Sequence, residues 1–195
     1  MDEYIDGQTP LNEEEKEQLL ISSISTQGEL NEFEQLNIQK AVEWSIRKKI
    51  SKENIFSEEF VRDLHRKMFD EVWKWAGHFR HSEKNIGIDP AQIGSSLNQL
   101  NGNCNLWVEK KIYPDEEIAI LYKHKLVSIH CFPNGNGRHS RLMADVIINH
   151  IFEKKVFTWS RSNIVKKGES RTHYLSALKE ADNGNIQPLI EFANS

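Results

Sequence analysis

The sequence has little cysteine and no long apolar segment, and each shortage excludes a class of protein. Cys104 and Cys131 are the only cysteines among 195 residues, too few and too far apart for a disulfide framework or a zinc knuckle. No apolar run approaches the roughly 18 residues needed to cross a bilayer. The acidic start MDEYIDGQTPLNEEEKEQLL is the reverse of a signal peptide. We therefore expect a protein that makes no membrane contact and works in a reducing cytoplasm.

An excess of positive charge is also missing. The chain carries 25 basic and 29 acidic residues, a net charge of −4. Broad nucleic-acid binding needs a basic surface, so we expect no direct nucleic-acid partner. A local basic pocket is still compatible with this balance.

The chain also lacks repeats and low-complexity linkers, and most of its segments show helical periodicity. A first helix is expected to open at Thr9, with Pro10 just inside it, where a missing N–H costs nothing. A second should bury one apolar face, formed by Leu30, Phe33, Ala41 and Trp44. A third should begin at the N-cap Ser57 and bury the stripe Phe60, Leu64, Met68 and Val72.

Residues 77–89 lose the helical period and contain Gly77 and Gly87, which favours a short extended hairpin. Helical patterns resume near Pro90, at Pro114, after residue 141 and in two short C-terminal segments. In the helix from Pro114 the expected buried line includes Lys125, whose stem would have to snorkel. The predicted fold class is an all-α bundle with one small β-hairpin.

The chemistry-bearing segment is the motif loop, residues 130–141, with the sequence HCFPNGNGRHSR. Gly135 and Gly137 allow a tight turn whose backbone N–H groups face a ligand, just before a helix N-terminus that favours an anion. Arg138 and Arg141 share one helix face and offer forked donors to phosphate oxygens. His130 titrates near neutrality and can take a proton from a hydroxyl. The plainer interpretation is a glycine turn with solvated arginines and a core histidine.

The loop resembles the signature of the Fic family, His-x-Phe-x-Asp/Glu-Gly-Asn-Gly-Arg-x-x-Arg. Seven of its eight specified positions match, namely His130, Phe132, Gly135, Asn136, Gly137, Arg138 and Arg141. Chance agreement would be on the order of one in a billion per start point. The resemblance runs from about Trp44 to the end and includes the tail YLSALKEADNGNIQPLIEF, most like the subgroup called mobile mystery protein B. It divides the chain into an N-terminal helical extension, 1–43, and a Fic domain, 44–195.

The resemblance implies a protein adenylyltransferase that moves AMP from ATP to a Ser, Thr or Tyr hydroxyl of a target protein, which can be the chain itself. His130 would be the general base. The nucleotide phosphates would lie on Gly135, Asn136 and Gly137, with Arg138 and Arg141 on the outer ones. Phe132 would anchor the loop in the core. The intact Gly137 favours nucleotide transfer over phosphate transfer.

Asn134 departs from the family signature, which has Asp or Glu there to hold Mg²⁺. A hard cation prefers charged oxygen ligands, and the amide of Asn134 supplies an oxygen without charge. Three hypotheses follow: a weakened adenylyltransferase, removal of AMP or another phosphate-linked transfer, and a nucleotide-binding regulatory module without catalysis.

Two further regions carry expectations from the resemblance. Residues 79–88 match the place of a β-hairpin flap that pairs with an extended target segment, and its candidate contacts are Phe79, Arg80, Asn85, Ile86, Gly87 and Ile88. Tyr174 would border the adenine pocket, or be an ordinary core tyrosine.

The inhibitory pattern Ser/Thr-x-x-x-Glu-Gly/Asn is matched by Ser25 and Glu29, although Leu30 replaces the last residue. Glu29 would bind Arg141 in place of a phosphate, because arginine binds carboxylate and phosphate in the same forked geometry. The alternative is a glutamate on a solvated helix start.

Overall fold

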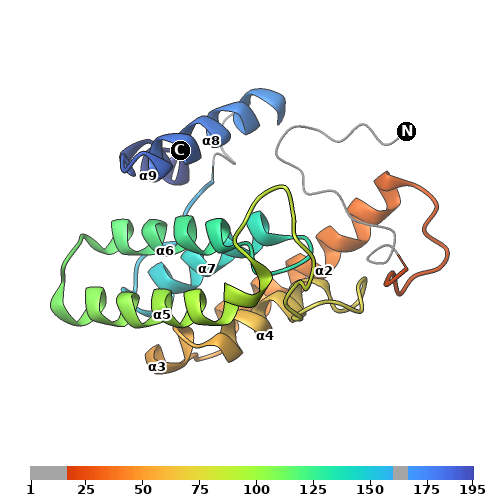
Figure 1. Ribbon diagram of the computed structural model, residues 1–195, viewed down its shortest axis with the longest axis horizontal. Coiled ribbons are helices and arrows are strands. Elements are labelled where there is room, and N and C mark those ends of the chain that lie inside the picture. Colours follow the sequence, from red (N-terminus) through yellow and green to blue (C-terminus); the bar gives the residue numbers. More distant parts are fainter. Residues whose placement is uncertain (1–16, 160–166) are drawn as a thin grey trace.

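The computed structural model describes residues 17–159 and 167–195, and the helix expected from Thr9 lies outside them. The described residues form α-helices and one short 3₁₀ helix (Figure 1). In chain order they are α2 (Gln27–Arg47), α3 (Lys52–Ile55), α4 (Glu58–Phe69), η1 (Pro90–Gln92), α5 (Ile93–Lys110), α6 (Asp115–Ile129), α7 (Asn136–His150), α8 (Lys167–Asp182) and α9 (Gln187–Asn194). The predicted all-α class is confirmed.

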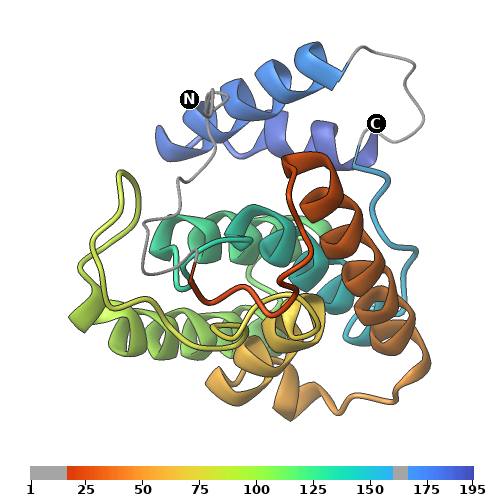
Figure 2. The ribbon, with the colours of Figure 1, turned by 90° about the vertical axis from the view of Figure 1, so that its right-hand side faces the viewer.

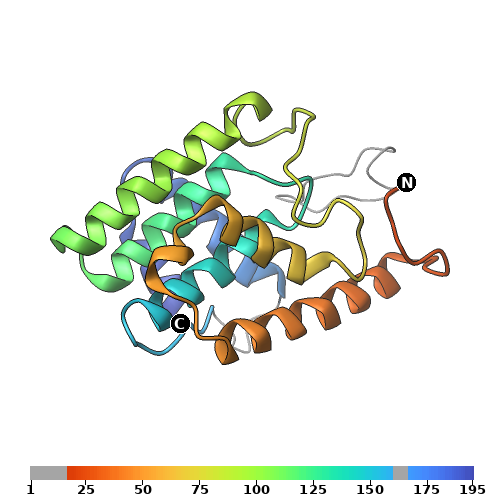
Figure 3. The same ribbon diagram turned by 90° about the horizontal axis from the view of Figure 1, so that it is seen from below.

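Helices α6 and α7 form the centre of the molecule. Helix α5 packs along one side of α6, and the paired helices α8 and α9 lie over the opposite side (Figures 1 and 2). Helix α2 runs along α4 and also contacts α7 (Figure 3). The loop between α6 and α7 is therefore surrounded by helices from both ends of the chain. None of the helices within the described residues has the length and apolar character that a membrane span requires.

Helix α4 follows the sequence prediction closely. The Ser57 hydroxyl accepts a hydrogen bond from the Phe60 N–H at 3.1 Å, the contact that an N-cap serine makes. The expected stripe is buried, with exposures of 7% or less at Phe60, Leu64, Met68 and Val72.

Helix α2 packs three of the four predicted apolar residues, Ala41 fully and Leu30 and Trp44 in part, against the core, but its buried face also includes polar residues. Phe33 is 41% exposed, while Glu34, Asn37 and Ser45 are buried beside Ala41. The polar side chains are hydrogen-bonded: Asn37 donates to the Lys67 carbonyl at 2.9 Å and accepts from the Glu71 N–H at 3.0 Å. Hydrogen-bond partners in α4 and in the turn after it offset the cost of burying these polar groups. The hydrophobic pattern of α2 alone cannot reveal such partners.

The expected β-hairpin at residues 79–88 is not formed. Among the described residues the structure contains no strand, only an isolated bridge between Leu19 and Trp73. The reason lies in Arg80, whose guanidinium donates to the carbonyls of Ser82 and Ile88. A side chain thus satisfies the backbone groups that would otherwise pair across a hairpin, and the segment is a loop.

Candidate active site

The motif loop is braced from within by Asn136. Its amide nitrogen donates to the Phe132 carbonyl at 2.8 Å, and its amide oxygen accepts from the Phe132 N–H at 3.0 Å. This side chain is only 4% exposed, so it shapes the loop instead of pointing at a ligand. Any phosphate contact of Asn136 has to come from its backbone N–H, in the first turn of α7, where donors lack intrahelical partners.

Gly135 is required at the turn into α7. Its φ is +78°, and an added Cβ would lie 2.5 Å from the Phe69 ring. A side chain would therefore be strained by its backbone and would collide with the core. This close contact seats the start of α7, and with it the anion-favouring end of the helix, against α4.

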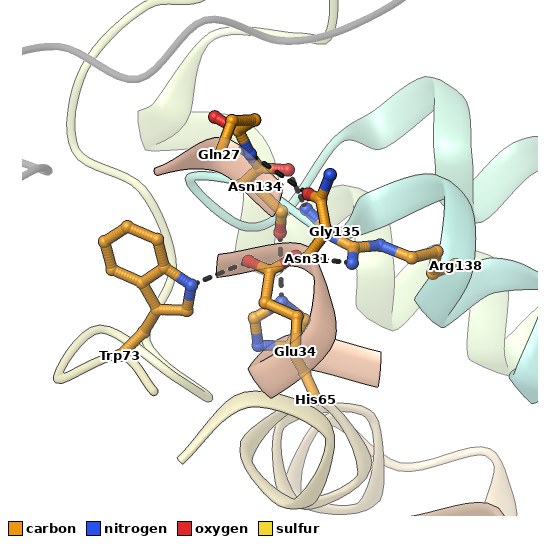
Figure 4. A network of polar contacts seen from close by, with 8 residues as sticks. All are labelled: Gln27, Asn31, Glu34, His65, Trp73, Asn134, Gly135 and Arg138. Carbon is orange, nitrogen blue, oxygen red and sulfur yellow. Dashed lines mark hydrogen bonds and ion pairs between the residues drawn. The ribbon is translucent and has the colours of Figure 1, made fainter. Parts of the chain in front are cut away.

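His65 of α4 holds the middle of the loop. The Gly77 N–H donates to its Nδ1 at 3.0 Å, so its Nε2 carries the proton and donates to the Asn134 carbonyl at 3.1 Å (Figure 4). Its ring stacks on Phe132, with 3.6 Å between ring centres. Burial lowers the pKa of His65 well below its ordinary value, which keeps this tautomer neutral. Phe132 is completely buried, as the family resemblance implied.

His130, the candidate base, terminates α6 in a left-handed conformation with φ +57° and is 3% exposed. Burial, together with the nearby cation of Arg80, lowers its pKa to about 4. A neutral imidazole at physiological pH is the form that can accept a proton.

Arg80 fixes the backbone at His130. Its Nε donates to the His130 carbonyl at 2.6 Å, and its backbone N–H donates to the Cys131 carbonyl at 3.0 Å. The guanidinium is therefore turned inward and Arg80 is 2% exposed, so its side chain is occupied within the protein. The sequence did not reveal that Arg80 holds the backbone of His130 and Cys131.

The rest of the candidate flap borders His130 as a loop. Gly87 has φ +102°, and a Cβ on it would lie 2.6 Å from the Cβ of His130. Asn85 and Ile86 at the tip are exposed, whereas Phe79 and Ile88 at its base are half-buried. The Ile88 N–H donates to the Ile129 carbonyl at 3.4 Å. An exposed segment thus stands directly beside the candidate base.

The arginines of the motif are held by side chains from distant helices. Arg138 Nη1 lies 2.6 Å from the Glu34 Oε2, and the other oxygen of Glu34 accepts from the Trp73 indole at 2.7 Å (Figure 4). Arg141 donates to the Gly137 carbonyl at 3.3 Å, and its guanidinium carbon is 5.5 Å from the centre of the Tyr174 ring. Sequence reasoning missed Glu34 because it stands in an acidic segment that looks solvent-exposed.

Glu29 does not make the expected contact with Arg141. Its carboxylate accepts hydrogen bonds from the N–H groups of Ser25 and Thr26 at 2.8 and 3.0 Å, and from the Ser25 hydroxyl at 3.1 Å. Thr26 in turn caps α2, which completes a capping box. The pattern of Ser25 and Glu29 marks a helix start, and these hydrogen bonds lower the pKa of the exposed Glu29.

Asn134, at the proposed metal position, is not arranged as a Mg²⁺ ligand. Its amide oxygen accepts from the Gly135 N–H at 2.6 Å. No group of three or more His, Cys, Asp or Glu side chains able to hold a metal occurs within the described residues. One neutral oxygen that is already hydrogen-bonded fits Mg²⁺ poorly.

A cavity of about 330 Å³ runs beside α7, with Arg138 and Arg141 on its wall. Apolar side chains form much of the remaining wall, including Val42, Met68, Leu142 and Trp159. The two arginines of the motif loop therefore also line a cavity that is large enough for a small ligand.

Comparison with known proteins agrees with this geometry. Residues 55–148 match the family model described as the Fic/DOC family. The Protein adenylyltransferase Fic of Aedes aegypti is 26% identical over 147 residues, which cover 73% of this chain and 28% of that protein. The one from Nematostella vectensis is 26% identical over 167 residues, covering 84% and 37%. This chain thus spans well under half the length of these relatives.

Solved structures share the fold. BepC protein from Bartonella tribocorum, with bound AMPPNP, aligns with a TM-score of 0.71 at 20% identity, over 94% of this chain and 97% of that one. The N-terminal Fic domain of a VirB-translocated Bep effector protein from Bartonella quintana gives 0.69 at 18%, over 88% and 84%. The motif loop, the helices around it and these matches lead to one conclusion: the chain belongs to the Fic/DOC family.

Proposed function

We propose that the protein is an adenylyltransferase that transfers AMP from ATP to a Ser, Thr or Tyr hydroxyl of a target protein, its own chain included. The observation that carries the proposal is His130. It is buried and neutral, with a pKa of about 4, and it shares a twelve-residue loop with the two arginines and the N-terminus of α7.

In the proposed reaction the target hydroxyl gives its proton to His130 as its oxygen attacks the α-phosphorus of ATP. The new bond joins that oxygen to the phosphorus, and the bond from the phosphorus to the bridging oxygen of the β-phosphate breaks. The products are AMPylated protein and pyrophosphate. The N–H groups at the start of α7, together with Arg138 and Arg141, stabilise negative charge on the phosphates. A target segment would lie along residues 79–88, beside His130.

Autoinhibition is the second part of the proposal, with the inhibitory carboxylate moved from Glu29 to Glu34. Glu34 lies 2.6 Å from Arg138 and its side chain is 8% exposed. A carboxylate and a phosphate compete for the same forked donors, so Glu34 opposes the binding of outer phosphates there. The carboxylate of Glu29 instead takes part in the capping box at the start of α2.

A second candidate function is a nucleotide-binding regulatory module. Asn134 favours it, because its neutral amide oxygen is bonded to the Gly135 N–H where the family signature has a carboxylate. AMP removal or another phosphate-linked transfer through this altered site is the remaining alternative.

Incubation with ATP labelled at the α- or at the γ-phosphorus separates these functions. Adenylyl transfer labels protein from α-labelled ATP only. Label from the γ-position would show phosphate transfer. Saturable ATP binding without label from either position, in wild type and in Glu34→Gln, would favour the regulatory module. Release of AMP from pre-AMPylated protein would identify the reverse activity.

A further inference from the structure

Lys123 is a completely buried lysine for which the proposed reaction has no use. It lies in α6 with 0% exposure. Its Nζ donates to the Tyr174 hydroxyl at 2.7 Å and lies 4.5 Å from the centre of that ring. Removing an ammonium group from water is costly unless the surroundings compensate it. The free-energy cost of burying Lys123 suggests that it has a role beyond packing.

Tyr174 of α8 connects Lys123 to the phosphate-binding arginine of α7. The guanidinium carbon of Arg141 lies 5.5 Å from the centre of the same aromatic ring. Cations are attracted to the face of an aromatic ring, and the Tyr174 hydroxyl is fixed by its hydrogen bond to Lys123. Tyr174 therefore contacts both the buried Lys123 and Arg141 of the motif loop.

The charges around this group favour an anion. Burial lowers the pKa of Lys123 well below its ordinary value, the cation of Arg141 lowers it further, and Asp182 raises it. Asp182 is itself hydrogen-bonded to His124 at 2.8 Å, and its side chain is 64% exposed, which weakens its influence on a buried amine. An anion placed at Arg141 would offset the guanidinium charge that lowers this pKa, and so would favour the charged form of Lys123.

We propose that Lys123 is a positioning residue of the phosphate site: acting through Tyr174, it holds Arg141 where the outer phosphates of a nucleotide lie. The site thereby selects nucleoside triphosphates over monophosphates. This inference rests on the proposed function, since it requires a nucleotide on the motif loop. The chemistry recognised is the charge of the β- and γ-phosphates, irrespective of the base.

Lys123→Met tests the proposal, because methionine has a similar length and no charge. Replacing a buried ionic group by an apolar one of similar volume is often neutral or stabilising. A purely structural lysine would thus change only the melting temperature. A positioning lysine changes nucleotide selectivity instead. Lys125→Met, an exposed position on the same helix, is the matched control, and Tyr174→Phe removes the hydroxyl while keeping the ring.

The measurement is calorimetric binding of ATP and AMP to the full chain and these variants, with thermal unfolding alongside. We expect ATP to bind about tenfold more weakly to Lys123→Met, the effect of losing a charged hydrogen bond, while AMP affinity and melting temperature hold. Tyr174→Phe should change selectivity in the same direction, and Lys125→Met should behave as wild type.

Three results would overturn the inference. One is a wild-type ratio of ATP to AMP affinity in a folded Lys123→Met protein, and another is an equal loss for both nucleotides. If Lys123→Met does not fold, Tyr174→Phe decides, and unchanged selectivity in that variant overturns it. If the wild type binds no nucleotide, the proposed function is wrong as well. If the wild type binds ATP but Lys123→Met keeps its selectivity, only the role of Lys123 is wrong.

Discussion

The two ends of the motif loop are held by different kinds of contact. At the His130 end, Arg80 reaches the His130 carbonyl at 2.6 Å from a segment that also bonds to Cys131 and Ile129 through its backbone. At the arginine end, Arg138 pairs with Glu34, which is 104 residues away in sequence, and Arg141 faces Tyr174 of α8.

Under the proposed function, this difference would separate catalysis from its control. The backbone bonds at His130 leave the base buried and neutral in one fixed place. The partner of Arg138 is the carboxylate of Glu34, which a phosphate can displace, whereas Arg141 faces the ring of Tyr174. The proposed base would thus be preformed, whereas access of the outer phosphates would depend on helices α2 and α8.

The largest effect is expected at the base. His130→Ala should lower the rate of label transfer from α-labelled ATP by about 10² to 10⁴, the usual contribution of a positioned general base. Nucleotide affinity, which depends on the other end of the loop, should hold in calorimetric titration. Labelling at the wild-type rate would disprove the role of His130.

The next effect distinguishes the two glutamates of α2. Glu34→Gln should raise self-labelling about tenfold, because it removes a charged hydrogen bond to Arg138 while the amide can still accept from Trp73. Glu29→Gln is the matched control. It should leave the labelling rate unchanged and slightly lower the melting temperature, because a neutral amide accepts weaker hydrogen bonds than a carboxylate at the start of the helix. Activation by Glu29→Gln alone would restore the inhibitory role first expected of that residue.

A smaller effect is expected at Asn134. In a Glu34→Gln background, Asn134→Asp should lower the magnesium concentration for half-maximal labelling about fivefold, which corresponds to ~1 kcal/mol for a charge pair in water. An aspartate can still accept from the Gly135 N–H, so the loop should be preserved. A fall in activity at every magnesium concentration would instead mean that the new carboxylate repels the nucleotide.

The smallest expected effect is that of mild acid on the base. Because the pKa of His130 is lowered to about 4, the imidazole stays neutral and able to accept a proton until the pH approaches that value. Protonation of His130 should therefore change the kcat/KM for labelling little between pH 7.5 and 5.5. A histidine with an ordinary pKa near 6.5 would lose about 90% of its neutral form at pH 5.5. An acid limb centred near pH 6.5 would contradict the buried, neutral base.

Sequence reasoning worked where the signal was local. The motif loop was located between two helices, and the cap and stripe of α4 were identified, because capping and periodicity depend on residues a few positions apart. It failed for the pattern of Ser25 and Glu29, since a capping box has a similar spacing. It also failed for α6, where the expected buried lysine, Lys125, is exposed and Lys123 is buried instead.

The sequence by itself determined the all-α class, the turn at Gly135 and the set of chemical groups that the loop presents. Residue type alone restricts backbone conformation and supplies donors, acceptors and a base. Only the tertiary structure decided that Glu34 meets Arg138, that Arg80 turns inward to His130, and that Lys123 is buried under Tyr174. These pairings depend on how distant helices pack, and a polar residue shows its burial only when its partner is in place.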